Sequence, residues 1–577
     1  MKDYHMIWRG LFGRRYDQVN GHNDISKQYQ NDQDNRNNTK QVLNDNRQRA
    51  LTFSLFGVGA FMSGLFILLV NPYNILYEWK LKFGPGGEIF SLWEKPPVDL
   101  FLKVYLWNVT NSEEYMSGKD TKLKFQEVGP YVFRELLAHE NVTFHDNGTL
   151  TTTPNHPLVW VEELSEGRKQ DDLLILPNIA LLSIADVVSK KNLFTRLGLN
   201  VIIRQTNSQP LVQMTAKEFM FGYRSTLMDL GNTFMPSWIY FDKLGLIDRM
   251  YDFRGDYATF FTGTKLGIKN IGLLDTYNGA KKIPQWDSPC GDIDGASDGT
   301  KFPGNIQPND RLLFFRKSMC RAKELVHVND TTVDGFKGYL YHFAPDADDN
   351  GRIHEKNRCF CKEEDINQCK PKGLLDVRGC YYGFPIALSY PHFYDSDPIL
   401  FDKIESGLNP DPEKHGSYFI IEPASGMPLK LASRYQINMA LGDLKNIANA
   451  DKFNNMVLPM LWIEIGMYGL PRNLKIRFKL YLEILPIAQT CLMYALFMCS
   501  IVACIYSIYK FITSRKTELR SYNAPWIEDD LVLNIDRKLS SYIPDKKSCL
   551  TPRELEIYFN SLLISPISMD NAIFEEP

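Results

Sequence analysis

The chain has very little net charge for its size. Its 577 residues include 65 Lys and Arg against 68 Asp and Glu, which leaves a formal charge of −3 at pH 7. This balance argues against a general nucleic-acid partner, because such proteins carry a strongly basic surface. The chain is also too long for one ordinary compact domain, so we expect several parts with different environments.

Two stretches lack charged residues altogether. Residues 51–70 read LTFSLFGVGAFMSGLFILLV, and residues 484–509 read ILPIAQTCLMYALFMCSIVACIYSIY. About twenty apolar residues suffice for a helix to cross the hydrocarbon core, whereas a buried core helix rarely stays apolar on every face for so long. We therefore predict spans at 51–70 and 484–512. The first has no A-x-A-like cleavage site and follows fifty residues, so it is expected to be an uncleaved signal anchor.

Basic residues flank the predicted spans on one side only. They are Arg47 and Arg49 before the first span, and Lys510, Arg515, Lys516 and Arg520 after the second. The positive-inside rule then places the tails 1–50 and 513–577 in the cytoplasm and residues 71–483 outside the cell or in a lumen. Four glycosylation sequons fall in this middle segment, at Asn108, Asn141, Asn147 and Asn329. They support its external location, while the sequon at Asn37 is expected to remain unmodified.

Cysteine is scarce, with ten residues in the whole chain. The six in the external segment are Cys290, Cys320, Cys359, Cys361, Cys369 and Cys380. An even number in an oxidising compartment favours disulfide bonds within 290–380, but spacing does not choose among the 15 possible pairings. Structural zinc is the weaker alternative, because the C-x-C spacing is unusual and no H-x₃₋₅-H motif accompanies it. Cys549 lies in the C-terminal tail, and Cys491, Cys499 and Cys504 lie in the second span, where Cys504 is a candidate for palmitoylation near Lys510.

The tails and the external segment differ in composition. Residues 17–48 are rich in Asn, Gln and Asp, which predicts disorder over most of the N-terminal tail. In the external segment, 151–164 and 416–423 have the pattern of strands, and 178–205 and 215–230 have the pattern of helices. The expected class is α+β with a large antiparallel sheet. Neither tail carries a clear acidic dileucine or Tyr-based sorting signal, which disfavours a dedicated lysosomal resident.

Two motif matches point to other functions, and we rank both below the main interpretation. GASDG at 295–299 fits a nucleophile elbow but lies in a polar loop without the required strand and helix. Asp346, Asp348 and Asn350 match the start of a calcium loop, yet Asn357 stands where a bidentate Glu is needed. They remain only a weak calcium candidate.

A two-span ligand-gated channel subunit is the main alternative from another class of protein. The charge-free runs 51–70 and 484–509 of this chain, however, contain only Gln489 as a strongly polar side chain. In the first span, Ala60 and Gly64 form a small-xxx-small pair that could support helix association.

A series of motifs in a fixed order identifies the family. They are GPYVFRE (129–135), EFMFGYR (218–224), DTYNGAKKIPQWDSPC (275–290), RCFC (358–361), YPHF (390–393), GLNPDPEKHGSYFIIEPASG (407–426) and VLPMLWIE (457–464). With the topology and cysteine spacing, they make the chain resemble the class B scavenger receptors, the cluster of differentiation 36 family, from the first span through the second. The resemblance excludes a channel and implies a receptor without catalysis or cofactor.

The resemblance also implies the fold and the disulfide pairs. The family fold is an antiparallel β-barrel-like ectodomain, capped by a helical bundle and containing a lipid tunnel. The family's pairing, placed on these positions, gives Cys290–Cys359, Cys320–Cys380 and Cys361–Cys369. The cap, which we call the apex, corresponds to residues 178–230.

The ligand-binding prediction rests on the apex and its excess of basic residues. We expect Lys190, Lys191, Arg196 and Arg204 to capture anionic groups. The expected partners are lipids, fatty acids, sterol esters, and lipoprotein or apoptotic particles. Lipid transfer at the plasma membrane is the main interpretation. Sorting of a protein partner in an endosome or lysosome membrane, or pheromone or carotenoid handling, are alternatives, and self-association as a homo-oligomer stays open.

Overall fold

The computed structural model describes residues 23–229 and 243–522. The chain divides into two units, one made of Met1–Leu68 and Leu492–Pro577, the other of Leu69–Cys491. The second unit is called the ectodomain below. The predictions for Cys549 and for the tail beyond residue 522 lie outside the described residues.

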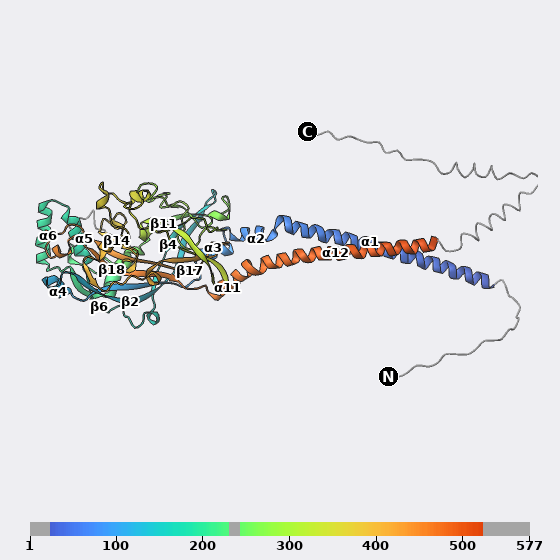
Figure 1. The fold of residues 1–577 in the computed structure, drawn as a ribbon, viewed down its shortest axis with the longest axis horizontal. Helices are drawn as coiled ribbons and strands as arrows, with labels where there is room; N and C mark the ends of the chain where they lie inside the picture. Colours follow the sequence, from blue (N-terminus) through green and yellow to red (C-terminus); the bar gives the residue numbers. More distant parts are fainter. Residues whose placement is uncertain (1–22, 230–242, 523–577) are drawn as a thin grey trace, which may run out of the picture. The chain divides into compact units, whose positions relative to one another are not determined.

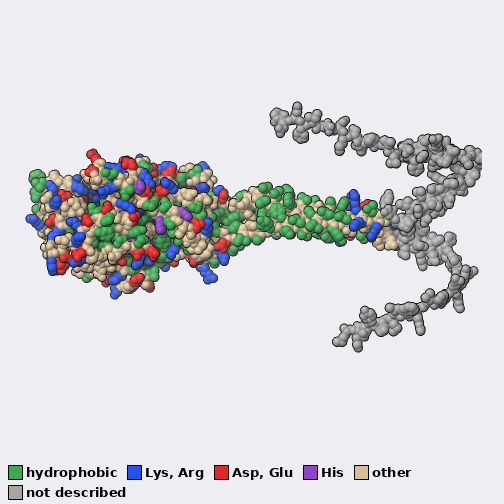
Figure 2. Space-filling model, viewed as in Figure 1, with side chains coloured by type: hydrophobic (Ala, Val, Ile, Leu, Met, Phe, Trp, Pro, Cys, Tyr) green, Lys and Arg blue, Asp and Glu red, His purple; other side chains and the backbone are tan. Residues whose placement is uncertain are grey.

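The first unit is built from two long helices. α1 runs from Asn23 to Val70 and α12 from Leu485 to Tyr522, and each contains a segment long and apolar enough to cross a membrane. Their apolar surface is visible as a continuous band in Figure 2. The two spans are therefore confirmed. The helix extends further than expected, because disorder was predicted for most of residues 1–50, whereas α1 begins at Asn23. Residues 23–50 contain neither Pro nor Gly, so a helix nucleated in the span can elongate through them at low cost.

Small residues of α1 meet α12. A Cβ atom added at Gly64 would lie 2.9 Å from a ring carbon of Phe497, and one added at Gly57 would lie 3.2 Å from Cys504 Sγ. Ala60, between them, is buried. Close approach of two helices in lipid depends on such small side chains. The small residues Gly57, Ala60 and Gly64 therefore allow α1 to pack against α12 of the same chain.

The ectodomain core is a large, mostly antiparallel sheet. Along its main path the order is β10-β11-β12-β16-β17-β18-β1-β2-β15, with β5, β13 and β14 attached at its side. Only β15 and β2 pair in parallel. The strands are β1 (Leu100–Val109), β2 (Leu123–Glu135), β5 (Leu158–Trp160), β10 (Leu312–Arg316), β11 (Arg321–Val333), β12 (Phe336–Phe343), β13 (Leu375–Asp376), β14 (Ile386–Ser389), β15 (Ile404–Ser406), β16 (Tyr418–Ile421), β17 (Pro428–Ala440) and β18 (Val457–Met467). The α+β class and the antiparallel sheet are confirmed.

The burial of each strand follows its place in the sheet. β18 is buried at ten of its eleven positions, as expected of a central strand covered on both faces. β1, beside it, mostly alternates between buried and half-buried positions. β1 pairs with β18 from Phe101↔Gly466 to Leu106↔Leu461, so the first and last strands of the ectodomain are neighbours.

Two smaller sheets and short helices complete the ectodomain. One sheet has the order β3-β4-β8-β9 and the other pairs β6 with β7. Their strands are β3 (Ala138–Phe144), β4 (Thr149–Asn155), β8 (Ala258–Phe261), β9 (Leu274–Tyr277), β6 (Leu173–Pro177) and β7 (Leu211–Thr215). The helices are α2 (Pro72–Leu81), α3 (Glu88–Glu94), α4 (Ser112–Ser117), α5 (Ile179–Ser189), α6 (Leu193–Gln205), α7 (Ala216–Phe221), α9 (Leu246–Met250), α10 (Pro412–His415), α11 (Arg472–Phe478) and the π-helical turn Lys479–Ile484. Within this unit α5 and α6 lie at the end opposite α2, α3 and α11 (Figure 1).

The predicted apical helices form, with two breaks. The helix expected over 178–205 divides between α5 and α6, where Asn192 caps the second helix by accepting a hydrogen bond from Thr195 N–H. The helix expected over 215–230 begins with a capping box between Thr215 and Glu218 and stops at Gly222, whose φ is 105°. The chain turns helical again at 226–229.

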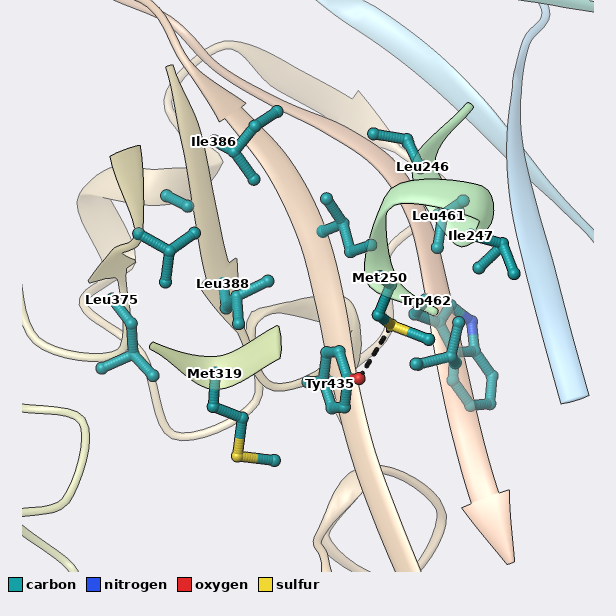
Figure 3. Close-up of a cluster of buried hydrophobic side chains, with 14 of the residues drawn as sticks. Leu246, Ile247, Met250, Met319, Leu375, Ile386, Leu388, Tyr435, Leu461 and Trp462 are labelled. Atoms are coloured by element: carbon teal, nitrogen blue, oxygen red, sulfur yellow. Dashed lines mark hydrogen bonds between the residues drawn. The ribbon is translucent and has the colours of Figure 1, made fainter. Parts of the chain in front are cut away.

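A buried cluster connects α9 to the sheet (Figure 3). The hydroxyl of Tyr435 on β17 donates a hydrogen bond to the sulfur of Met250, 2.9 Å away. Leu246 and Ile247 pack on the same side, near Leu461 of β18. This packing positions the residues that follow α9, which line the cavities described below.

Candidate functional site

The four predicted capture residues differ in their exposure and in their partners. Lys190 forms an ion pair with Asp186 at 3.1 Å, and Asp186 also accepts a hydrogen bond from Gly442 N–H at 2.7 Å. Lys190 therefore helps to hold α5 against the loop after β17. Arg196 is half-buried. Lys191 and Arg204 are exposed, and these two are available for a ligand.

An exposed apolar surface on α6 was not predicted. Leu193, Phe194, Leu197 and Val201 are between 51% and 83% exposed, and we call them the α6 apolar surface. Leu199 and Ile203 face the core instead. Apolar residues at helical spacing usually indicate a buried face, so the sequence could not show which ones remain outside. Hydrophobic and basic side chains are both visible at this end of the ectodomain in Figure 2.

Three hollows follow one another inside the ectodomain. The outer hollow has a volume of about 910 Å³, the central cavity about 130 Å³ and the inner cavity about 50 Å³. The outer hollow and the central cavity share Pro154, His156 and Phe253. The central and inner cavities share a second set, which is Leu92, Met427 and Leu474. The hollows thus lie in series, although the structure does not show one continuous tunnel.

The outer hollow is polar at its surface. Its lining includes Arg249, which forms ion pairs with Asp248 and Asp252, and Arg254, which pairs with Asp252 at 2.8 Å. Burial raises the pKa of the Asp252 carboxyl, but the hydrogen bond from Arg254 outweighs it and lowers the pKa to about 2. Asp252 is therefore ionised at any physiological pH.

The central cavity is mainly apolar, with side chains from β17 and β18 on one wall. Leu431 and Ser433 are two residues apart on β17, so they lie on the same face of the sheet. Ser433 is 2% exposed, and its hydroxyl has no hydrogen-bond partner within the described part of the chain. Ile465, which pairs with Ser433 in register, lines the cavity from β18. A buried hydroxyl in an apolar wall can serve a ligand oxygen.

A buried carboxylate organises the neck between the outer hollow and the central cavity. Glu135, at the end of β2, accepts hydrogen bonds from His156 at 2.5 Å, Tyr251 at 2.6 Å and Arg316 at 3.3 Å. Burial raises the pKa of Glu135, but the positive charge of Arg316 and the bonds from His156 and Tyr251 lower it to about 2. Tyr251 is buried as well, and this burial together with the negative charge of Glu135 raises the pKa of the Tyr251 hydroxyl well above its usual value. This cluster was not predicted from the sequence, although Glu135 is the last residue of the GPYVFRE motif.

The other acidic and basic residues of the central cavity also have partners, whereas the buried Tyr277 hydroxyl has no hydrogen-bond partner within the described part of the chain. His139 stacks on Trp93 with ring centroids 3.8 Å apart, and it lies within hydrogen-bond distance of Asp298, at 3.3 Å. Burial raises the pKa of Asp298, whereas the bond from His139 lowers it, and the net shift is downward. Lys317 forms an ion pair with Asp256. An anionic group entering this cavity would have to displace one of these existing pairs.

The inner cavity lies where the ectodomain chain continues into α12. Its lining comes from α2, α3, α11 and the π-helical turn, with Leu81, Ile89 and Phe478 as apolar members. Glu88 stands at its border and forms ion pairs with Arg477 and, at 4.0 Å, with Lys80. Nearby on α2, Trp79 is 64% exposed. Exposed Trp beside Lys is typical of a membrane–water interface.

The structure contains the three disulfides that the family resemblance implies. Cys290–Cys359 and Cys320–Cys380 close long loops with sequence separations of 69 and 60, and Cys361–Cys369 closes a short one of 8. No group of three His, Cys, Asp or Glu residues suited to a metal occurs in residues 23–229 and 243–522.

The calcium candidate residues have other partners. Asp346 pairs with Lys356, and Asp348 pairs with Lys323 at 2.5 Å. Asn350 donates hydrogen bonds to the carbonyl oxygens of Leu374 and Lys370. The structure therefore does not bring the three side chains together as ligands, because each one fixes a different part of the loop.

The candidate modification sites differ in exposure. Asn141, Asn147 and Asn329 are exposed. Asn108 is half-buried in β1, and its side-chain oxygen accepts a hydrogen bond from Ile175 N–H. A glycan would attach to Nδ2 of Asn108, the atom that donates a hydrogen bond to Gln126 Oε1 at 3.3 Å, so modification of this site would compete with that bond. Cys504 lies against Gly57 of α1 and is half-buried, so its thiol is less accessible than the exposed Cys499.

The structure thus combines two helices able to span a membrane, one disulfide-bonded ectodomain and a series of internal hollows. A family model described as the CD36 family matches residues 55–511, and the chain belongs to this family. It is 29% identical over 424 residues to the scavenger receptor class B member 1 of Mus musculus, which covers 72% of this chain and 81% of that protein. It is 30% identical over 398 residues to lysosome membrane protein 2 of Homo sapiens, covering 68% of this chain and 79% of that protein. Protein peste of Drosophila melanogaster is 25% identical over 419 residues, covering 71% and 74%.

Proposed function

We propose that this protein is a receptor that captures lipid-bearing particles at its apex and transfers lipid through the ectodomain into the membrane. The observation that carries the proposal is the series of three hollows linked by shared lining residues. A hydrocarbon chain costs about 0.8 kcal/mol for each CH₂ group moved from an apolar site into water, so an internal apolar route removes a large barrier. The relatives named as scavenger receptors support the same function.

Capture would take place on the α6 apolar surface together with Lys191 and Arg204. The apolar side chains can insert into the surface of a particle, while the two basic residues attract anionic head groups. Charged head groups that are not desolvated contribute mainly to the association rate, whereas apolar burial contributes to affinity.

The cargo that best fits the central cavity is uncharged. The acidic and basic residues of its lining are already paired within the protein, as described above, so a free carboxylate would lack a cationic partner. Ser433 offers one hydroxyl to an ester or alcohol oxygen, and the rest of the lining is largely hydrocarbon. Sterol esters and similar neutral lipids therefore fit better than ionised fatty acids. Passage of a whole lipid requires the three hollows to open into one another.

The membrane in which this transfer takes place is proposed to be the plasma membrane, with both tails in the cytoplasm. The basic residues beside the two spans support this orientation. Lysosome membrane protein 2 is similar to a comparable extent, so residence in an endosome or lysosome membrane is the alternative. Surface biotinylation of the full chain, compared with its fraction in lysosomes, separates the two.

The test is lipid uptake by cells that express the full chain. Ala258 lines the central cavity and is 3% exposed, so Ala258→Trp should fill it. Particles carrying a labelled, non-hydrolysable sterol ether should bind as before, whereas transfer of the ether should fall by about tenfold, equivalent to about 1.4 kcal/mol. Ile399→Trp, at a 58% exposed position outside the cavities, is the matched control. Unchanged ether transfer by a normally expressed Ala258→Trp protein would refute the internal route.

A further inference from the structure

A fourth hollow lies in the disulfide region and shares no lining residue with the three hollows in series. Its volume is about 330 Å³. One side is formed by the Cys361–Cys369 disulfide, and Trp286 and Phe360 contribute aromatic rings that are only 6% and 9% exposed. We call it the disulfide hollow. Since disulfides restrict the loops around it, the hollow should be present before any ligand arrives.

The lining of the disulfide hollow is rich in cations. Arg378 is bound to Asp376, with Nε 2.9 Å from Oδ2, and lies 3.8 Å from Glu363. Lys362 has its ammonium 5.5 Å from the centre of the Trp286 ring. Lys370 has no ion pair or hydrogen bond from its ammonium group to any residue in the described ranges. Burial and the nearby charge of Arg378 lower the pKa of Lys370, as expected of a cation without a direct partner.

A second cation without a full set of partners lies beside this hollow. Arg321 is 1% exposed, and its Nε and Nη1 atoms have no hydrogen-bond partner within the described part of the chain. Its guanidinium lies 3.6 Å from the ring centre of Phe360, and Nη2 is 3.5 Å from Asn350 Oδ1. Both Phe360 and Asn350 line the hollow. Buried groups of this kind are normally satisfied, so their presence indicates that a partner is missing.

The nearby carboxylates of Asp348, Asp349 and Asp376 act on Arg321 through their charge but do not provide the missing hydrogen bonds to Nε and Nη1. Asp348 pairs with Lys323. Asp349 accepts hydrogen bonds from the backbone N–H groups of Gly351, Ile353 and His354. Asp376 is held by Arg378, as above. An external anion would therefore meet the ammonium groups of Lys362 and Lys370, neither of which is held in an ion pair within the described residues, near an Arg321 whose hydrogen bonds are incomplete.

We propose that the disulfide hollow binds a tetrahedral oxyanion, a phosphate or sulfate ester, through Lys370 and Lys362. Ammonium and guanidinium groups form strong, charge-assisted hydrogen bonds to such oxygens. The volume leaves room for the organic part of the ester beside Trp286, whose ring face can pack against it. The ester could be a soluble molecule or a lipid head group. This site is independent of lipid transfer, since it shares no residue with the three hollows.

The direct test is protection of Lys370 from acetylation in the full-length protein held in lipid nanodiscs. Lys372 is two residues away, forms an ion pair with Asp395 at 2.6 Å and does not line the hollow, so it is an internal control. Mass spectrometry would follow both lysines with added inorganic phosphate, inorganic sulfate, or sodium chloride at the same ionic strength. We expect phosphate or sulfate to slow acetylation of Lys370 at least threefold relative to chloride, with Lys372 unaffected. Equal effects of all three salts, or no effect of any, would overturn the proposal.

Binding of labelled orthophosphate by equilibrium dialysis gives a second, independent measurement. Lys370→Met should weaken binding at least fivefold, and the matched variant Lys372→Met should leave it unchanged. Equal binding by wild type and Lys370→Met would overturn the proposed site. Protection by glycerol 3-phosphate would identify a soluble ester as sufficient, whereas protection by a short-chain phosphatidate alone would identify a lipid head group. Either result supports the oxyanion site, and unchanged sterol ether transfer by Lys370→Met would show its independence from the transfer route.

Discussion

The imidazole of His156 stacks on the ring of Phe253, with centroids 4.7 Å apart. With Pro154, these residues are the ones that the outer hollow and the central cavity have in common. His156 is fixed from the other side by Glu135. The width of the neck therefore depends on the side chain of Phe253, which packs against the His156 ring that Glu135 holds in place.

Truncation of Phe253 should widen this neck. We expect Phe253→Ala to raise the rate of sterol ether transfer about fivefold, which corresponds to a barrier lower by about 1 kcal/mol. The rate should be measured at saturating particle concentration, so that capture does not limit it. Ile399→Ala, outside the hollows, is the control. A transfer rate equal to that of the wild type would mean that the neck is not a bottleneck.

The pair Glu135 and Arg316 should make ectodomain stability depend on acid. Because the pKa of Glu135 is lowered from 4.5 to about 2, its contribution is fully present above pH 4.5 and is lost as the pH falls toward 2. The shift corresponds to about 3 kcal/mol of unfolding free energy. Denaturant unfolding followed by tryptophan fluorescence between pH 5 and pH 2 would measure it.

Replacement of this carboxylate provides the control for the pH experiment. Glu135→Gln leaves Arg316 buried without its counter-charge, so we expect a loss of about 3–5 kcal/mol at pH 7. The acid dependence should shrink in the same variant. Glu163→Gln, at an exposed position, should change neither quantity. If Glu135→Gln kept the full acid dependence, another group would be responsible for it.

The three disulfides should differ in their contribution to stability. In the chain-entropy model, loops of 60 and 69 residues each contribute about 4 kcal/mol, whereas the eight-residue loop contributes about 2.5 kcal/mol. Unfolding of the double variants Cys320→Ala/Cys380→Ala and Cys361→Ala/Cys369→Ala should rank in that order. The opposite order would show that the short loop has a role beyond entropy, such as shaping the disulfide hollow.

Capture at the apex should depend on two separable contributions. Phe194→Asp combined with Leu197→Asp should reduce particle affinity at least tenfold, or about 1.4 kcal/mol, without loss of stability, since both side chains are exposed. Lys191→Gln combined with Arg204→Gln should mainly slow association and reduce its salt dependence. Surface plasmon resonance with lipid particles at two salt concentrations distinguishes the apolar contribution from the electrostatic one. Unchanged binding in both double variants would place capture elsewhere.

Some of these features could be predicted from the sequence and others could not. The spans follow from charge-free runs at 51–70 and 484–509, because length and apolarity alone determine them. The exposure of Phe194 and Leu197 could not be predicted, because it depends on which face of α6 is buried. The role of the Lys190–Asp186 ion pair in holding α5 against the loop after β17 could not be predicted either. Lys and Asp four residues apart can form the same pair on an isolated helix. Spacing left fifteen cysteine pairings open, and only the family resemblance reduced them to one.

The cavities could not be predicted from any local sequence pattern, because their walls come from residues far apart in the chain. Ser433 and Ile465 lie side by side only because β17 and β18 pair in one register. Glu135 and Arg316 are 181 positions apart in the chain. Residues 23–50 are a case in which a local pattern gave the wrong prediction. Their composition predicted disorder, but the helix of the adjacent span continues through them.

The pairing of β1 with β18 has a mechanical consequence. The two strands are antiparallel neighbours from Phe101↔Gly466 to Leu106↔Leu461, and each is close in sequence to one membrane span. A protease that cut a surface loop between them would produce two fragments, each with its own anchor, still joined by this ladder. A cut between Cys320 and Cys359 would also leave the Cys290–Cys359 and Cys320–Cys380 bridges as covalent links between the halves. A nicked receptor of this kind would stay assembled at the membrane, and only reduction followed by denaturation would separate its pieces.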